Sequence, residues 1–373
     1  MSKPSVSRRG SRRSANGNGL ALQDSREIID KVQTLLSTDP HDARSVLLRE
    51  MLDSVLKLHQ QSVDVLDVKI LSRALKELRY AFRVFQPYRN RPKVSIFGSA
   101  RTPPTDPNFQ LAARFGKLLS ERGFMVITGA GPGIMDAGHQ GAGKDHSFGV
   151  NIMLPFEQSA NTTIADDPKL VHLKYFFTRK LLFVREAHAT ALFPGGVGTM
   201  DEAFEVLTLV QTGKSHPVPL VCLEAPGTAY WEHWVNFLKD QLLPRGLISE
   251  SDLYLFKVFD HEEAAVREIQ QFYRNYHSLR YVDGQLVVRI QNPLTEEELE
   301  RAREEFQDLV MGGTISQQGP LPKEEDEPDL LHLQRLVLHH HRRNAGRLRQ
   351  FIDYLNACGK PSASDFSAVK LHS

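Results

Sequence analysis

The chain has 373 residues, enough for one large domain or two ordinary ones, and its 41% hydrophobic content is typical of soluble globular proteins. Its 46 Lys and Arg nearly balance its 45 Asp and Glu, so no global field predicts binding to nucleic acid or to a membrane surface. Two cysteines, Cys222 and Cys358, exclude a disulfide framework and a four-thiolate zinc site. No apolar run approaches the roughly 18 residues that span a bilayer. These properties predict a cytoplasmic protein whose site must be found in local motifs.

The first 22 residues are basic and rich in Ser, Gly and Asn, with no acidic residue before Asp24. Such a composition cannot build a core, so residues 1–22 are predicted to be a disordered tail. An organelle transit peptide, which is also Arg- and Ser-rich and poor in acids, is the alternative. From Asp24 to about Phe85, apolar residues recur at helical spacing, which predicts a helical N-terminal region over residues 23–90.

The pattern then changes to short apolar runs separated by helical stretches. Five of these runs are predicted to be strands: 94–97, 124–128, 148–152, 189–193 and 219–223. Strands that alternate with helices indicate βαβ units, and continuous apolar runs suit parallel strands covered on both faces. The pattern therefore predicts a Rossmann-like α/β domain with a doubly wound parallel sheet over residues 91–278.

A C-terminal extension is predicted over residues 279–358, followed by a tail over 359–373. It begins with an Asp283-Gly284 pair between apolar arms, which indicates a β-hairpin. Thr295 and Glu298 fit a capping box that opens an amphipathic helix ending near Met311. A charged linker at 320–328 then precedes a second helical stretch, predicted over 330–355.

Glycine clusters follow three of the predicted strands. They are Gly98-Ser99-Ala100-Arg101 after the first strand, Gly129-Ala130-Gly131-Pro132-Gly133-Ile134-Met135 after the second, and Pro194-Gly195-Gly196-Val197-Gly198-Thr199 after the fourth. In an open parallel sheet, ligands bind beyond the carboxyl ends of the strands, and glycine lets the backbone approach an anion closely. One cluster is explained by turn geometry alone, but three at one edge predict a phosphate-binding site.

Two common nucleotide motifs are absent. Gly129, Gly131 and Gly133 give the spacing G-x-G-x-G, so the third position of the dinucleotide fingerprint falls on Ile134. The following strand also lacks an acid for the ribose before Glu157. The chain contains no Gly-x-x-x-x-Gly-Lys-Ser/Thr motif either. Among nucleotide-binding sites, the sequence therefore favours one that binds a mononucleotide and does not transfer hydride.

Thr199-Met200-Asp201-Glu202 opens the helix after the third cluster and allows two interpretations. In the first, Thr199 and Glu202 form a capping box and are structural. In the second, the Glu202 carboxylate faces the sugar of a nucleotide whose phosphate lies in the glycine turn. Glu202 can do only one of these fully, and the sequence alone favours neither.

Arg179 and Lys180 stand where another helix is predicted to begin. Cations at a helix N-terminus oppose the helix dipole, at a cost of about 0.3–1 kcal/mol each unless they point into water. A bound anion or a carboxylate partner would remove that cost, and the planar fork of Arg suits phosphate or carboxylate.

The run His339-His340-His341 and the neighbouring Arg342 and Arg343 also stand out. Only some of the three histidines can share one helical face, so a structural role is preferred over a metal site. For the two arginines a solvated helix face is preferred, and the alternative is an anion site for a regulatory nucleotide.

Several of these segments together resemble the Lonely Guy family, long described as lysine decarboxylases. The resemblance covers about residues 92–225 and rests on Gly129 to Met135, Arg179-Lys180, the pattern Pro-Gly-Gly-x-Gly-Thr-x-x-Glu from Pro194 to Glu202, and Leu207 to Lys214. Members of the family are phosphoribohydrolases, which split nucleoside 5′-monophosphates into free base and ribose 5-phosphate. The resemblance therefore implies hydrolysis of an AMP-like purine nucleotide or a cytokinin riboside monophosphate.

The resemblance also implies roles for individual residues. Arg179 and Glu202 would be catalytic. The other residues expected around the substrate are Gly98, Ser99, Gly129, Gly131, Gly133, Met135, Glu157, Lys180, Gly195, Gly196, Val197, Gly198, Thr199, Asp201 and Thr208. A carboxylate can stabilise an oxocarbenium-like state and activate water, so no metal or redox cofactor is expected. Family members are typically homodimers, so a homodimer or larger homo-oligomer is expected.

The chain departs from compact family members in two ways. It has Gly129-Ala130-Gly131 where they generally carry three consecutive glycines, and it has long extensions on both sides. These features put specificity for cytokinin nucleotides in doubt. The long extensions make the chain more similar to larger bacterial nucleotide nucleosidases. The competing hypothesis is a nucleotide-binding sensor or assembly protein without catalysis on the same fold.

Overall fold

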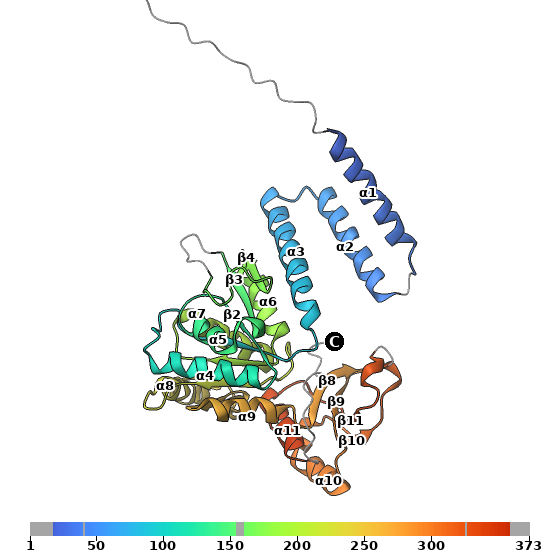
Figure 1. Ribbon diagram of the computed structural model, residues 1–373. Helices are drawn as coiled ribbons and strands as arrows, with labels where there is room; N and C mark the ends of the chain where they lie inside the picture. Colours follow the sequence, from blue (N-terminus) through green and yellow to red (C-terminus); the bar gives the residue numbers. More distant parts are fainter. Residues whose placement is uncertain (1–17, 40–41, 154–159, 325–326, 359–373) are drawn as a thin grey trace, which may run out of the picture. The chain divides into compact units, whose positions relative to one another are not determined.

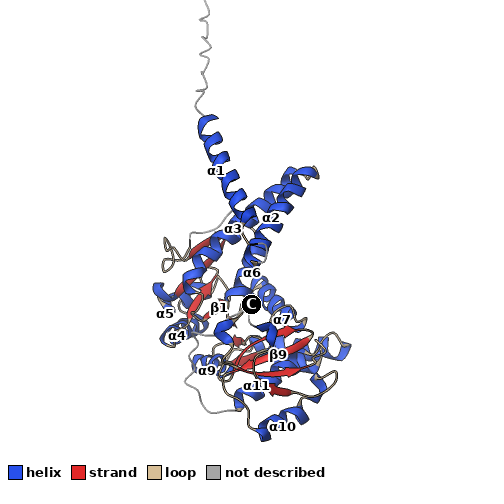
Figure 2. Cartoon of the chain, turned by 90° about the vertical axis from the view of Figure 1, so that its right-hand side faces the viewer, coloured by secondary structure: helices blue, strands red, loops and turns tan. Residues whose placement is uncertain are grey.

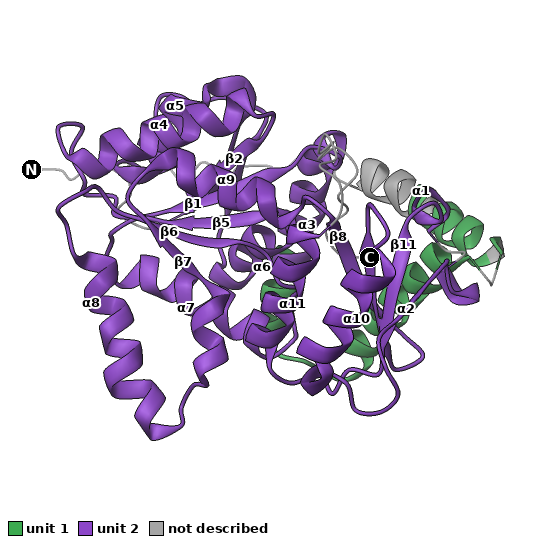
Figure 3. Ribbon diagram, turned by 90° about the horizontal axis from the view of Figure 1, so that it is seen from below, with its two compact units in different colours: residues 1–73 green, residues 74–373 purple. Residues whose placement is uncertain are grey.

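The structure is a computed structural model that describes residues 18–39, 42–153, 160–324 and 327–358. By its internal contacts the chain divides into two compact units, residues 1–73 and 74–373 (Figure 3). The division falls within helix α3 (Val65–Phe85), and each unit is described by itself below. Among the described residues, no helix has both the length and the apolar character needed to cross a bilayer.

The first unit contains α1 (Asn18–Ser37), α2 (Ala43–Gln60) and the beginning of α3. Asp42 caps α2 by accepting a hydrogen bond from the Ser45 N–H at 2.9 Å. Arg49 on α2 donates to the Thr38 carbonyl at the end of α1, at 2.6 Å. The predicted helical region is confirmed, but α1 already begins at Asn18. The tail predicted over residues 1–22 was therefore too long, and residues 1–17 lie outside the described part of the chain.

A seven-stranded parallel sheet forms the centre of the second unit, with strand order β4-β3-β2-β1-β5-β6-β7. Its strands are β1 (Lys93–Phe97), β2 (Met125–Thr128), β3 (Ser147–Ile152), β4 (Leu170–Leu173), β5 (Ala189–Leu192), β6 (Leu220–Leu223) and β7 (Lys257–Phe259). Strand β1 lies in the middle, because Val94 pairs with Val126 on one side and with Ala189 on the other. The predicted doubly wound α/β fold is confirmed.

Helices cover both faces of this sheet (Figures 1 and 3). One face packs against α4 (Pro107–Glu121), α5 (Ile134–Ala142) and α9 (Glu262–Phe272), and the other against the end of α3, α6 (Phe176–Glu186), α7 (Val197–Gln211) and α8 (Tyr230–Phe237). Successive side chains of a strand point to opposite faces, so Ile96 joins the first core and Phe97 the second. Because both faces are covered, the central strands are largely apolar, which is why five of them could be recognised as continuous runs.

The sequence prediction missed two strands of the sheet. Strand β4 is only four residues long and contains the exposed His172, and β7 is three residues long with no buried position. Both lie at the edges of the sheet, where burial is incomplete. The third glycine cluster consequently follows the fifth strand of the chain and not the fourth.

A four-stranded antiparallel sheet, of order β10-β11-β9-β8, follows the parallel sheet in the chain (Figure 2). It consists of β8 (Tyr276–Val282), β9 (Gln285–Ile290), β10 (Ser316–Gln318) and β11 (Gln334–Leu338). The predicted hairpin is confirmed, since Asp283 and Gly284 connect β8 to β9 with φ angles of 49° and 83°. Helix α10 (Glu296–Glu305) begins with the predicted capping box, in which the Thr295 N–H donates to Glu298 at 2.8 Å.

The helical stretch predicted over 330–355 was wrong in its first half. Residues 334–338 form β11, and α11 begins only at Ala345 and ends at Ala357. The reason is the side chain of Arg335, which is fully buried and donates to Glu324 at 3.1 Å. Glu324 also accepts from Arg289 of β9 at 2.6 Å, so one buried carboxylate joins two strands.

Removing this carboxylate tests how much the antiparallel sheet depends on it. Glu324→Ala leaves two guanidinium groups buried without their shared partner, so we expect a loss of about 3–5 kcal/mol of unfolding free energy in urea denaturation. The matched control is Glu297→Ala, which removes an exposed partner of Arg301 and should cost less than about 1 kcal/mol. Equal losses in the two variants would contradict a structural role for Glu324.

Candidate active site

A pocket of about 620 Å³ lies beyond the carboxyl ends of β1, β2 and β5. Strands β1 and β5 are neighbours in the sheet although their chain connections run to opposite sides, and this is the switch point at which doubly wound sheets bind ligands. The volume falls within the roughly 300–1,000 Å³ of small-molecule sites. The residues that line it are Phe97, Gly98, Ser99, Ala100, Arg101, Gly129, Gly131, Met135, Asn151, Ile152, Phe176, Arg179, Gly196, Val197, Gly198, Thr199 and Glu202.

The first two glycine clusters let the loops pack closely at the floor of the pocket. A Cβ on Gly98 would lie 2.7 Å from the side chain of Ile134, and one on Gly133 would lie 2.2 Å from the Ser99 carbonyl oxygen. Gly133 also has a φ of 68°, which favours glycine. The Ile134 N–H donates to the Ser99 carbonyl at 3.0 Å and ties the two loops together.

The third cluster forms the N-terminus of α7. Gly196 is the N-cap and no side chain caps the helix, while the first turn contains no acidic residue. A Cβ on Gly196 or on Gly198 would meet nothing within 4 Å, so open space lies beside this end of the helix. Unpaired N–H groups and the positive end of the helix dipole make such an N-terminus suitable for an anion.

The capping-box interpretation of Thr199 and Glu202 is wrong. The helix begins two residues before Thr199, whose own N–H donates to the Gly196 carbonyl at 3.1 Å. Thr199 therefore lies inside the first turn and cannot be the N-cap. Its partner in the motif, Glu202, lines the pocket instead.

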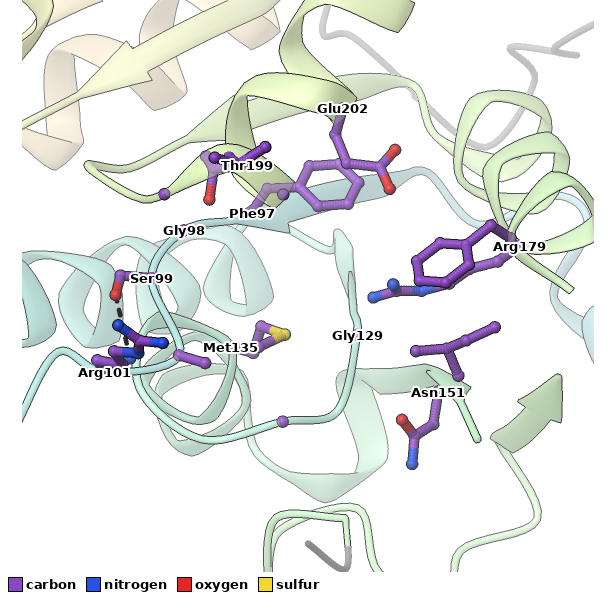
Figure 4. Close-up of a pocket in the computed structure, with 17 residues that line it drawn as sticks. Phe97, Gly98, Ser99, Arg101, Gly129, Met135, Asn151, Arg179, Thr199 and Glu202 are labelled. Carbon is purple, nitrogen blue, oxygen red and sulfur yellow. Dashed lines mark hydrogen bonds between the residues drawn. The ribbon is translucent and has the colours of Figure 1, made fainter. Parts of the chain in front are cut away.

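Glu202 is a buried carboxyl group, with 6% of its surface exposed. Burial raises the pKa of Glu202 to about 7, and the nearby cations of Lys180 and Arg179 oppose this rise. In Figure 4 the Glu202 carboxyl and the Arg179 guanidinium point into the same space. A carboxyl group with a pKa near 7 can accept or release a proton at neutral pH.

Arg179 is held in place from β3 and from its own helix. Its Nε donates to the Val150 carbonyl at 3.2 Å, and its guanidinium lies 5.3 Å from the centre of the Phe183 ring. The preceding residue, Thr178, donates to the Glu77 carboxylate of α3 at 2.9 Å and fixes the beginning of α6. These contacts leave the end of the guanidinium at the edge of the pocket (Figure 4).

Lys180 has carboxylate partners on α7. It lies 2.9 Å from Asp201 and also pairs with Glu205. These pairs join α6 to α7, which carry Arg179 and Glu202 respectively. The ion pairs therefore set the distance between the two helices that contribute the charged groups of the pocket.

The structure brings together most of the residues predicted for the site. Those that line the pocket are Gly98, Ser99, Gly129, Gly131, Met135, Arg179, Gly196, Val197, Gly198, Thr199 and Glu202. Those that do not line it are Gly133, Lys180, Gly195, Asp201 and Thr208. Gly195 accepts a hydrogen bond from the Tyr230 hydroxyl at 2.7 Å, and Thr208 lies near the far end of α7. Glu157 lies outside the described residues.

Phe97, Ala100, Arg101, Asn151, Ile152 and Phe176 line the pocket but were not predicted as site residues. Two of them carried a signal in the sequence. Arg101 ends the first glycine cluster, and Asn151 is a polar residue within an otherwise apolar strand. Phe176 could not be recognised, because nothing in its sequence neighbourhood separates it from the other apolar residues of α6.

The histidine run lies beyond the end of β11 rather than on a helix. His340 is buried and bridges to Val310, whereas His339 is exposed. Within the described parts of the chain, no group of three or more His, Cys, Asp or Glu side chains is placed to hold a metal ion.

Comparison with known proteins shows similarity to one family. The profile of a family described as "possible lysine decarboxylase" matches residues 133–269. A cytokinin riboside 5′-monophosphate phosphoribohydrolase of Arabidopsis thaliana is 28% identical over 172 residues, which are 44% of this chain and 76% of that protein. Over the parallel-sheet domain, the chain is similar to the Lonely Guy family of phosphoribohydrolases.

Two further similarities differ in extent. A pyrimidine/purine nucleotide 5′-monophosphate nucleosidase of Escherichia coli K12 is 32% identical over 119 residues, which cover 30% of this chain but only 26% of that protein. The molybdenum cofactor carrier protein of Chlamydomonas reinhardtii is similar in structure, with 17% identity, a TM-score of 0.33, and coverage of 48% of this chain and 97% of that one.

The position of Gly129 gives a test of the pocket. A Cβ at this position would lie 2.4 Å from Arg179 Nη2 and 2.8 Å from Met135 Sδ, the ends of two flexible side chains. Gly129→Ala should therefore fold normally but displace the guanidinium, and we expect about tenfold weaker binding of AMP by calorimetry. Gly312→Ala, where a Cβ meets open space away from the pocket, is the control. Unchanged affinity in Gly129→Ala would mean that Arg179 does not contact the ligand.

Proposed function

We propose that this protein hydrolyses the N-glycosidic bond of nucleoside 5′-monophosphates to give the free base and ribose 5-phosphate. The observation that carries the proposal is the buried Glu202 carboxyl, which shares a pocket with Arg179 and with the uncapped N-terminus of α7. The relatives named as phosphoribohydrolase and nucleotide nucleosidase support the same reaction.

The 5′-phosphate binds at the N-terminus of α7. Gly196 and Gly198 leave room for it beside the helix, and its charge interacts favourably with the helix dipole. Ser99 and Arg101, from the loop after β1, lie at the same end of the pocket and supply a hydroxyl and a cation (Figure 4). This anchoring leaves the ribose to extend toward Glu202.

Bond cleavage takes place at C1′ of the ribose. Water adds to C1′ as the C1′–N bond breaks, the bonding electron pair leaves with the base, and the Glu202 carboxylate accepts the proton of the water. Transfer of this proton to the departing base nitrogen, directly or through water, gives the free base and restores the carboxylate. The same carboxylate stabilises the positive charge that develops on the sugar ring. Arg179 and Lys180 keep part of the Glu202 population ionised at neutral pH, because both lower the pKa that burial raises.

The base lies on the side of Asn151 and Phe176, which line the pocket from β3 and α6 and not from the glycine-rich loops. The amide of Asn151 can donate and accept hydrogen bonds, and the ring of Phe176 can stack. Both AMP-like purine nucleotides and cytokinin riboside monophosphates fit this description, so the preferred base is not assigned.

A catalytic role is preferred over binding without chemistry. A module that only binds a nucleotide needs cations and N–H donors near the phosphate and an ionised carboxylate for the ribose hydroxyls, but it does not need a carboxyl group whose pKa burial raises to about 7. Burying an ionisable group is unfavourable, and such groups cluster at catalytic sites. Glu202 is such a group, whereas Asp201, next to it in the sequence, is exposed and pairs with Lys180.

We also propose that the protein forms a homodimer or larger homo-oligomer in the cytoplasm and does not bind nucleic acid. Phe177 and Leu181 on α6 and Val197 and Phe204 on α7 are exposed, on two helices joined by the Lys180 ion pairs. Large apolar side chains exposed on neighbouring helices favour an interaction surface, and a second copy of the chain would cover them beside the pocket.

Assaying free base from a panel of nucleoside monophosphates tests the reaction. Purified protein should release base and ribose 5-phosphate in equal amounts from at least one of AMP, GMP, CMP, UMP and isopentenyladenosine monophosphate. Glu202→Gln should reduce kcat on the order of 10²–10⁴-fold, because the amide cannot accept the proton. Glu263→Gln, an exposed carboxylate on α9, is the control and should be fully active.

Binding of the nucleotides without release of any base, equally in wild type and Glu202→Gln, would favour the non-catalytic hypothesis.

A further inference from the structure

A second, smaller cavity of about 170 Å³ lies at the opposite end of α7 from Glu202. The segment after α7 supplies Lys214 and His216, strand β8 supplies Tyr281, and the turn between β11 and α11 supplies His340, Arg342 and Arg343. All of these residues belong to the second unit. The reaction proposed above uses none of them.

The charged side chains that line the cavity are all positive. Lys214, Arg342 and Arg343 carry full positive charges, and no Asp or Glu lines the cavity. Elsewhere in this unit, cations at partly buried positions face carboxylates, as Lys180 faces Asp201 and Arg347 faces Asp308 at 2.8 Å. Lys214, Arg342 and Arg343 are solvent-exposed, and because no carboxylate lines the cavity, their combined positive charge attracts an anion to it.

His340 shows which kind of group the cavity would receive. It is 5% exposed, and its Nδ1 accepts a hydrogen bond from the Arg342 N–H at 3.2 Å and lies 2.7 Å from the Tyr281 hydroxyl. A backbone N–H can only donate, so Nδ1 carries no proton and Nε2 does. Nε2 is buried and has no hydrogen-bond partner among the described residues. A buried donor without a partner costs free energy. His340 lines the cavity, so an oxygen atom bound there that reached Nε2 would remove this cost.

The His340 ring also resists protonation and stays neutral. Burial lowers the pKa of His340 to about 4, and the neighbouring His341 and Arg342 add to this effect. The ring is therefore neutral at physiological pH and offers one N–H. The Arg342 guanidinium lies 4.1 Å from the centre of the Tyr281 ring, which holds this cation beside the cavity.

We propose that this cavity binds the phosphate group of a small ligand, with His340 Nε2–H as a neutral donor and Lys214, Arg342 and Arg343 as cations. The cavity is smaller than the roughly 300 Å³ at which sites for whole drug-sized ligands begin. It therefore takes inorganic phosphate or the phosphate end of a phosphate monoester, not an entire nucleotide. This binding site does not depend on the proposed hydrolysis.

Calorimetric titration of the full-length protein with inorganic phosphate, at constant ionic strength, tests the proposal. Lys214→Gln/Arg343→Gln removes two exposed cations, so the fold should not change. We expect this variant to bind one phosphate fewer per chain than wild type, or to bind it at least tenfold more weakly, with an unchanged Tm in phosphate-free buffer. The matched control is Lys239→Gln/Arg267→Gln, which removes two exposed cations that do not line the cavity.

A second arm with ribose 5-phosphate separates the two sources of the phosphate group. Loss of the inorganic phosphate site alone supports free phosphate as the ligand, and loss of sites for both compounds supports a phosphate monoester. Identical stoichiometry and affinity in wild type, variant and control, for both compounds, would overturn the proposal. Base release provides a separate readout, so failure of this site and failure of the proposed hydrolysis are distinguishable.

Discussion

Burial of the Glu202 carboxyl group is the constraint on which the rest of the pocket depends. A carboxylate removed from water must either take up a proton or find positive charge nearby, and Glu202 does both in part. Its pKa is raised to about 7, while Arg179 and Lys180 limit the rise. The ion pairs of Lys180 with α7, and the hydrogen bond from Arg179 to β3, therefore maintain the charge state of Glu202 as well as the geometry of the pocket.

The parallel sheet places this carboxyl opposite a site for an anion. Because β1 and β5 are adjacent at the switch point, the loops after them meet, and the Ser99 N–H donates to the Pro194 carbonyl at 3.1 Å. Glycines at 98 and 133 allow that approach, and those at 196 and 198 leave the beginning of α7 open. One helix, α7, thus presents N–H groups for the phosphate at its first turn and the Glu202 carboxyl for the ribose slightly further along.

The central part of this arrangement could be predicted from the sequence, because buried parallel strands are apolar runs and their glycine-rich ends are local patterns. The capping-box interpretation of Thr199 failed because the sequence shows a Thr-x-x-Glu spacing but not where the helix begins, and Gly196 begins it. Strand β11 was predicted as helix because Arg335 is buried only through Glu324, a contact between residues that no local pattern connects. Asn151 and Phe176 join the pocket through tertiary packing in the same way.

The most direct test of this account is the pH dependence of stability in wild type and Glu202→Gln. A carboxyl whose pKa is about 7 in the folded state and near its usual 4.5 in the unfolded state destabilises the fold as the pH rises between these values. The free energy of unfolding of Glu202→Gln relative to wild type should therefore increase from pH 4.5 to 7, by on the order of 3 kcal/mol, and then level off. A difference that stays constant over this range would contradict a desolvated Glu202 at the centre of the site.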